Sequence, residues 1–234
     1  MPAAPEGSVE VVYQSGTLTL RAFASPPGRP DASKPAVLFL HGGFAFGEGH
    51  WAMTRPFRDA GYVVMIPVLR GENGQPGAFS LFFDEVDDVL AAAGVLASRP
   101  DVDPKKLYVA GHSVGGTLTL LAALASSRFR AAASFSGSPD QVEYTRGRPD
   151  RVPFDPANRE EFRIRSPVAF ATHFRCSVRL YFGDEELWLQ NPTRRAALLA
   201  KAAGLDVKAV EVPGGHDTAN PEVIKSCIAF FQGH

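Results

Sequence analysis

The sequence predicts a single α/β domain built on a mostly parallel central sheet with helices on both faces. Short apolar runs alternate with helical segments along most of the chain, which is the order expected of repeated β-α units. Several of these runs are continuously apolar, as strands buried on both faces of a sheet require. A length of 234 residues lies within the range of one α/β domain.

The composition is typical of a globular protein. Hydrophobic residues make up 45% and charged residues 21% of the chain, and the formal net charge is −1. This balance gives no reason to expect nucleic acid or an anionic membrane as a partner. Residues 1–10 lack the features of a secretory signal, and no apolar run approaches the roughly 20 residues that span a bilayer. We therefore expect a cytoplasmic protein, and the sequence predicts no particular oligomeric state.

The amino-terminal part of the chain predicts a hairpin followed by the first buried strand. β-Favouring residues at 9–13 and 17–23 flank a short turn, which is the pattern of an antiparallel pair. A connector rich in turn residues covers 26–35. The apolar run 36–40 then predicts a buried strand that ends at a His-Gly-Gly sequence.

The remaining elements alternate between helix and strand. The amphipathic segment 82–98 carries carboxylates near its start, where negative charge stabilises a helix through its macrodipole. The strand 107–110 runs directly into Gly111, and a helix begins just after Ser113 and extends to residue 126. The other predicted elements are, in order, helix 51–60, strand 62–68, strand 131–135, strand 178–182, helix 193–203, strand 207–212 and helix 221–231.

Residues 138–175 interrupt this alternation, and we call them the lid segment. They are rich in Arg, Asp, Glu, Pro and Phe without a clean period, and such long segments in compact domains are often functional. We interpret the segment as a small lid inserted beside the site. Its arginines could bind a substrate carboxylate, but nearby acidic residues balance their charge and favour a solvated surface. These arginines are Arg146, Arg148, Arg151, Arg159, Arg163 and Arg165.

The clearest chemical signal is the G-x-S-x-G sequence at 111–115. It follows an apolar strand and opens a helix, which is the setting of the nucleophile elbow in the α/β-hydrolase fold. The serine of such an elbow lies on a strained turn, where glycine at both flanking positions removes Cβ atoms that would clash. The motif therefore predicts the α/β-hydrolase fold with Ser113 as its nucleophile.

A serine hydroxyl is a weak nucleophile and needs a base that is held by an acid. In this fold the acid and then the histidine follow the serine, each after a later strand. His216 lies directly after the strand 207–212, so we predict that it is the base. We interpret the other histidines as structural or surface residues: His41, His50, His112, His173 and His234.

The acid comes from the Gly-Asp-Glu-Glu run at 183–186, which follows the strand 178–182. Any of the three carboxylates in this run can lie near His216. By residue type alone, Asp184 is the first candidate.

The His-Gly-Gly-Phe run at 41–44 predicts part of an oxyanion hole. A tetrahedral intermediate needs two hydrogen-bond donors aimed at its oxyanion. One donor in this fold is the backbone N–H after the nucleophile, which belongs to Val114. The second is expected from the backbone of Gly43 or Phe44.

Taken together, these motifs resemble the catalytic domain of the prolyl oligopeptidase group, which includes acylaminoacyl peptidases, dipeptidyl peptidases and related small esterases. The resemblance extends from about residue 36 to the carboxyl terminus. The matching pieces are His41-Gly42-Gly43, Arg70-Gly71 with Gly74 and Gly77, Val102-Asp103-Pro104, the elbow with Gly116, the run 183–186 and His216.

The resemblance also bears on the acid. The group places it at the third residue after the glycine that ends the acid strand, which is Glu186 in this chain. The group's usual residue is Asp, so a glutamate departs from its pattern, although Glu serves as the acid in other enzymes of the fold. Glu186 is thus the implied acid, with Asp184 as the alternative.

These signals predict a serine hydrolase, most specifically a carboxylesterase that acts on small acyl esters through an acyl-enzyme. Two alternatives stay open: a small peptidase of the acylaminoacyl-peptidase type, and a catalytically silent binding module, because the fold does not imply the activity. The expected partner is a small ester or a short peptide. We expect no cofactor and no metal, because Cys176 and Cys227 fit no metal-ligand or redox spacing.

Overall fold

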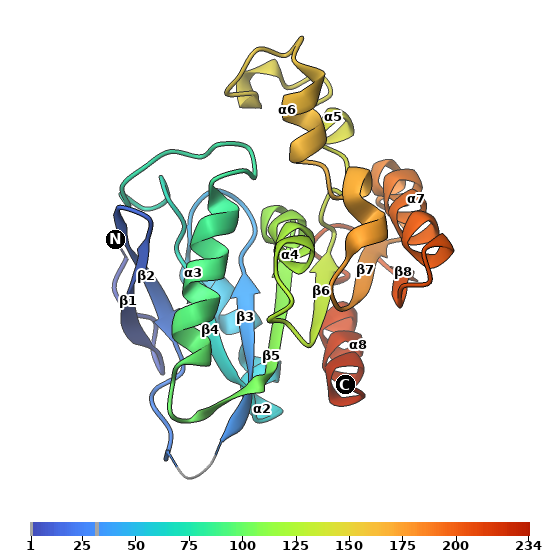
Figure 1. Ribbon diagram of the computed structural model, residues 1–234. Helices are drawn as coiled ribbons and strands as arrows, with labels where there is room; N and C mark the ends of the chain where they lie inside the picture. Colours follow the sequence, from blue (N-terminus) through green and yellow to red (C-terminus); the bar gives the residue numbers. More distant parts are fainter. Residues whose placement is uncertain (1, 31–32) are drawn as a thin grey trace.

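The computed structural model describes residues 2–30 and 33–234, so the part of the predicted connector at 31–32 lies outside the described residues. Within the described chain, eight strands form one sheet in the order β1-β2-β4-β3-β5-β6-β7-β8 (Figure 1). The strands are β1 (Val9–Ser15), β2 (Leu18–Ala24), β3 (Lys34–Leu40), β4 (Val63–Pro67), β5 (Val102–His112), β6 (Ala131–Phe135), β7 (Ser177–Gly183) and β8 (Val207–Val212).

The pairing directions agree with the predicted mostly parallel sheet. β1 pairs antiparallel with β2, which is the predicted hairpin, and β2 pairs antiparallel with β4. All other neighbouring strands from β4 to β8 run parallel. Because the parallel strands end at one edge of the sheet, the loops that follow them gather there, and this edge is where open α/β sheets bind ligands.

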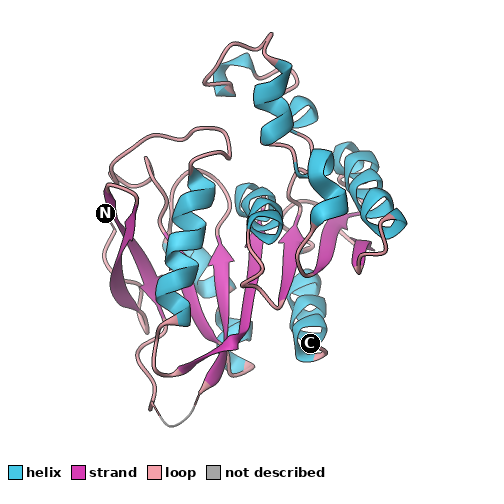
Figure 2. Cartoon of the chain, in the orientation of Figure 1, coloured by secondary structure: helices cyan, strands magenta, loops and turns pink. Residues whose placement is uncertain are grey.

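Helices cover both faces of the sheet (Figure 2). The α-helices are α1 (Glu48–Met53), α2 (Arg55–Asp59), α3 (Glu85–Ala97), α4 (Val114–Ala125), α5 (Gln141–Tyr144), α6 (Arg159–Ile164), α7 (Leu187–Ala202) and α8 (Asn220–Gln232). Two 3₁₀ segments, η1 (Pro149–Arg151) and η2 (Pro167–His173), lie in the lid segment. No helix in the described residues is both long enough and apolar enough to cross a membrane.

The sheet separates two apolar cores. Successive residues of a strand point to opposite faces, so Leu38 of β3 packs in the core beside α3, α4 and α7. Its neighbours Val37 and Phe39 pack on the other face with residues of α1, α2 and α8. Both faces of β3 are therefore buried, which is why its sequence is continuously apolar.

Two predicted helices differ from the structure. The predicted helix 51–60 is divided into α1 and α2, which meet at Thr54, with Pro56 in the first turn of α2. The helix predicted at 193–203 begins earlier, at Leu187, and continues through Pro192. A proline in a helix removes one backbone hydrogen bond. Here it lies near the start of a long helix, and the proline is buried.

The lid segment contains α5, η1, α6 and η2 rather than irregular chain. Figure 1 shows α5 and α6 above the sheet, on the side to which the arrows of the parallel strands point. The segment thus stands over the edge at which the predicted site residues are found.

Candidate active site

Ser113 occupies the sharp turn between β5 and α4. Its φ is 55° and its ψ is −114°, a conformation that residues with a side chain rarely adopt. A Cβ atom added at Gly115 would overlap the carbonyl oxygen of Leu40, and one at Gly111 would overlap the carbonyl oxygen of Gly115. Both glycines of the G-x-S-x-G run are therefore required sterically to bring the turn this close to β3.

His216, in the loop after β8, lies between Ser113 and Glu186. Its Nε2 atom is 2.9 Å from Ser113 Oγ, and its Nδ1 atom is 2.6 Å from Glu186 Oε1. A carboxylate only accepts hydrogen bonds, so Nδ1–H donates to Glu186 and Nε2 is free to accept the proton of the serine hydroxyl. The three side chains form one hydrogen-bonded chain.

The carboxylates of the run 183–186 have different surroundings. Glu186 is 4% exposed, and its second oxygen accepts hydrogen bonds from Ser136 Oγ at 2.6 Å and from the Gly183 N–H at 2.8 Å. Asp184 is exposed and accepts the N–H of Gly214 at 2.8 Å instead. Of the two acids considered from sequence, only Glu186 lies within hydrogen-bond distance of His216.

The electrostatics of the pair follow from this geometry. The hydrogen bond and the charge of Glu186 raise the pKa of His216 above its usual value, although burial acts in the opposite direction. Burial alone would raise the pKa of Glu186, but hydrogen bonds from His216, Ser136 and the Gly183 backbone hold it below its ordinary range. Glu186 is therefore ionised at neutral pH and stabilises a protonated imidazole.

Ser136 was not predicted as a site residue. It follows β6 directly, has a φ of 51°, and donates its hydroxyl hydrogen bond to Glu186. The available signal was its position, because a polar residue at the carboxyl end of a parallel strand lies at the edge where ligands bind.

His112, at the variable position of the elbow, contacts the site through its ring. Its Nε2 donates to the backbone carbonyl of His216 at 2.8 Å, which anchors the histidine loop to the elbow. Burial lowers the pKa of His112, so the ring is neutral at neutral pH. A Cβ atom on Gly42 would lie 2.9 Å from its Nδ1, so the glycine makes room for this ring.

His41 anchors the first turn of the predicted oxyanion loop. Its ring is buried, with Nε2 2.9 Å from Glu72 Oε2 and Nδ1 3.0 Å from the carbonyl of Gly42. Burial lowers the pKa of His41, but the hydrogen bond and charge of Glu72 prevail and raise it. These two contacts fix the loop against the segment that follows β4.

The predicted oxyanion donors lie around the nucleophile. Gly43, with a φ of +71°, Phe44 and Val114 line the same cavity of about 450 Å³ as Ser113. The lid segment and α7 supply the outer part of its wall through Tyr144, Arg148, Arg151 and Trp188. A cavity of this size is suited to a small molecule.

No group of three or more His, Cys, Asp or Glu side chains in the described chain is arranged to hold a metal ion. Cys176 and Cys227 are free thiols, and Cys227, a residue of α8, is buried in the core that this helix covers.

Comparison with known proteins identifies a matching family and a related bacterial protein. A model of the prolyl oligopeptidase family matches residues 50–234, which is most of the chain. The protein named "Uncharacterized peptidase YtmA" from Bacillus subtilis is 24% identical over 196 residues, covering 75% of this chain and 72% of that protein.

Solved structures share the fold. An acylaminoacyl peptidase from Pyrococcus horikoshii matches with a TM-score of 0.81 and 20% identity, over 96% of this chain but only 41% of that one. A hyperthermophilic esterase from the archaeon Pyrobaculum calidifontis matches with a TM-score of 0.78 and 19% identity, over 98% of this chain and 86% of that one. This chain thus spans less than half of the acylaminoacyl peptidase. By its family match and its fold, it belongs to the prolyl oligopeptidase family of α/β-hydrolase-fold serine hydrolases.

Proposed function

We propose that this protein is a serine hydrolase that cleaves small acyl esters through an acyl-enzyme. The observation that carries the proposal is the double hydrogen bonding of His216, at 2.9 Å to Ser113 and at 2.6 Å to Glu186. A nucleophile, a base and an acid in this order at the mouth of a cavity are the parts that acyl transfer needs.

In the proposed reaction, Ser113 Oγ attacks the ester carbonyl carbon while His216 Nε2 takes the hydroxyl proton. The tetrahedral intermediate then collapses, and His216 returns the proton to the departing alcohol. Water attacks the acyl-enzyme by the same proton transfers and releases the acid and the free serine. Glu186 stays ionised throughout, keeps Nδ1–H oriented, and stabilises the imidazolium that forms.

Charge that develops on the carbonyl oxygen would be stabilised by backbone donors. The N–H of Val114 is one proposed donor, and that of Gly43 or Phe44 is the other. Loss of one such donor typically costs about 10²–10³ in rate. The proposal is supported by the presence of all three residues in the wall of the cavity that contains Ser113.

A peptidase is the second candidate, favoured by the family match and by the acylaminoacyl peptidase among the structural relatives. The same side chains can cleave an amide, so the ester–amide preference must be measured. We favour esters because the chain matches the Pyrobaculum esterase over 86% of that enzyme's length.

The test compares p-nitrophenyl acetate and butyrate with a dipeptide p-nitroanilide in the wild-type protein and in Ser113→Ala. We expect ester hydrolysis to dominate, and the variant to lose about 10⁴- to 10⁶-fold in kcat because the three groups act as a unit. Dominant amide cleavage would instead establish the peptidase. If no substrate is turned over and a fluorophosphonate does not label Ser113, the hydrolase proposal fails and the catalytically silent binding module is the alternative that remains.

A further inference from the structure

The six arginines between residues 146 and 165 of the lid segment fall into two sets, those that form an ion pair with a glutamate of the segment and those that do not. Acidic neighbours therefore balance the charge of only some of these arginines, and not of all of them. Arg146, Arg163 and Arg165 pair within the segment, with Glu143, Glu160 and Glu161 respectively. For Arg148, Arg151 and Arg159, no carboxylate oxygen in the described chain lies within 4.0 Å.

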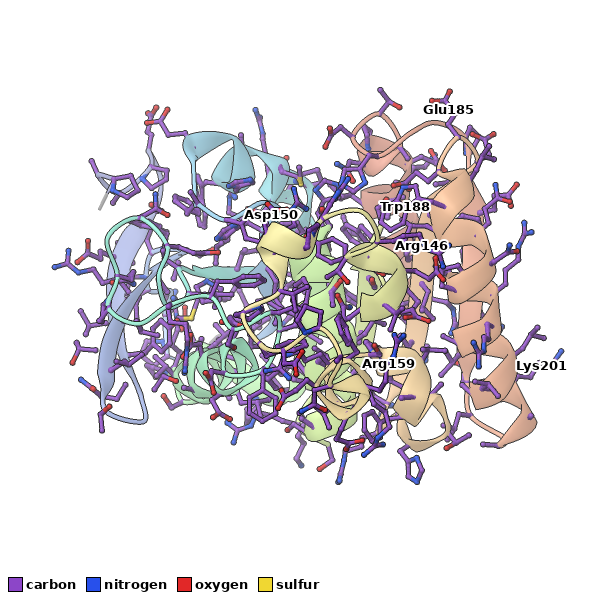
Figure 3. The ribbon with its side chains drawn as sticks, turned by 90° about the horizontal axis from the view of Figure 1, so that it is seen from above. Arg146, Asp150, Arg159, Glu185, Trp188 and Lys201 are labelled. Carbon is purple, nitrogen blue, oxygen red and sulfur yellow. The ribbon has the colours of Figure 1, made fainter. Side chains whose placement is uncertain are left out.

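Two of the arginines without a carboxylate partner line the cavity of the nucleophile. Arg148 and Arg151 line the same cavity as Ser113 and His216. An adjoining groove of about 660 Å³ shares Arg148 with this cavity and adds Arg146 and Arg195. Figure 3 shows Arg146 and Trp188, two residues of this groove, close together between the lid segment and α7.

Arg151 is held in place by aromatic groups rather than by an acid. Its guanidinium lies 5.8 Å from the ring centroids of both Phe44 and Tyr144, and its Nη1 donates to the Tyr144 hydroxyl at 3.3 Å. Such contacts orient an arginine while its charge stays available to another partner. Because Phe44 belongs to the predicted oxyanion loop, the charge is held close to the reacting centre.

The acids that line the two cavities are engaged with other groups or lie away from these arginines, and one of them, Glu143, pairs with Arg146. Glu186 accepts hydrogen bonds from His216 and Ser136. Glu185 lines the cavity, but its Oε2 lies beside Gly215, 3.0 Å from where a Cβ would be. Figure 3 shows it on the loop before α7, away from the lid segment. Asp140, in the adjoining groove, caps α5 by accepting the N–H groups of Val142 and Glu143.

We infer that Arg148 and Arg151 bind a carboxylate of the substrate. The inference rests on the proposed hydrolase function and narrows its substrate class to acyl compounds that carry a carboxylate on the acyl part or on the leaving group. A guanidinium presents a planar set of donors that matches a carboxylate. In a cavity of about 450 Å³, a carboxylate bound there leaves the scissile carbonyl of the same small molecule near Ser113.

The experiment uses two pairs of esters that differ only in charge. In the first pair, mono-p-nitrophenyl adipate carries a carboxylate on the acyl part, and its methyl ester is the uncharged counterpart. In the second pair, 3-acetoxybenzoate carries the carboxylate on the leaving group, and its methyl ester is again the uncharged counterpart. The quantity measured is the ratio of kcat/KM for the charged and the methyl-capped ester. In Arg148→Gln/Arg151→Gln we expect this ratio to fall roughly tenfold to hundredfold for one of the pairs, which identifies the charged part.

Two further variants separate local binding from other effects. Arg151→Lys keeps the charge and should retain most of the ratio. Arg159→Gln removes the same charge from α6, outside both cavities, and should leave the ratio unchanged. A ratio that stays unchanged for both pairs in the double variant, or falls equally in Arg159→Gln, would overturn the inference.

Failure of the proposed function is distinguishable from failure of this subsite. If the methyl-capped esters are hydrolysed but the ratios do not respond, only the subsite is wrong. If the wild-type protein hydrolyses none of the four esters, the proposed function fails. The subsite is then tested by calorimetric binding of monomethyl adipate, which the double variant must weaken by at least about tenfold.

Discussion

The carboxyl edge of the sheet and the lid segment face the same cavity but are built differently. At the sheet edge, backbones approach so closely that glycine is required, and buried polar side chains are held by several partners each. In the lid segment, short helices carry exposed ion pairs between residues three apart in the chain, such as Glu160 with Arg163. The difference indicates that close backbone packing holds the site residues at the edge, whereas the lid segment contributes side chains to the same cavity without such packing.

The largest expected effect in this comparison is at Glu186. Replacement of Glu186 by Gln should lower kcat roughly 10³- to 10⁴-fold, because an amide stabilises neither the tautomer nor the charge of His216. Asp184→Asn is the matched control, since its oxygen can still accept the Gly214 N–H. Steady-state hydrolysis of p-nitrophenyl butyrate measures both, and equal losses would remove the distinction between the two acids.

The pH profile gives an independent measurement on the same pair. Because Glu186 raises the pKa of His216, the wild-type kcat/KM should fall on the acid side at a higher pH than an unperturbed histidine would give. Glu186→Gln removes the cause of that shift, so its acid limb should move to lower pH. An acid limb that stays in place would mean that Glu186 does not set the pKa of the base.

Two glycines, one at the sheet edge and one in the lid segment, test whether backbone packing differs between the two regions. Gly115→Ala should destabilise the fold by about 3 kcal/mol or more, because the new methyl group meets the rigid backbone of Leu40. Gly147, in the lid segment, has a φ of +72° with no atom within 4 Å of an added Cβ, so Gly147→Ala should cost only about 1 kcal/mol. Urea denaturation gives both values, and similar costs would contradict the contrast.

The smallest expected effect concerns how the lid segment is attached. Arg165 is 6% exposed, donates to the carbonyl of Ser80, and stacks on Phe83 and Phe154. Arg165→Ala should cost about 1–3 kcal/mol and increase tryptic cleavage within the lid segment.

Arg163, on the same stretch but exposed, provides the matched control for that variant. Arg163→Ala should leave the free energy of unfolding nearly unchanged, since exposed ion pairs contribute little. Equal cleavage rates in the two variants would show that Arg165 does not anchor the segment.

Local sequence patterns were sufficient for the sheet and for two of the site residues. The continuously apolar run of β3 and the glycines around Ser113 reflect burial and steric limits that act within a few residues. Chain order then directed attention to His216. The start of the helix at Leu187 was mispredicted because Pro192 signals a helix boundary locally, whereas in the folded domain this proline is buried within the helix.

Patterns in the sequence were enough to predict the α/β architecture, the elbow at Ser113 and the histidine loop, because each depends on neighbouring residues. Only the folded structure shows that Glu186 rather than Asp184 reaches His216, that Ser136 and His112 support the pair, and which lid arginines have no carboxylate partner among the described residues. These contacts join residues that are distant in the chain, 104 positions apart for His112 and the His216 carbonyl. Their partners are set by strand register and loop packing, which no local pattern encodes.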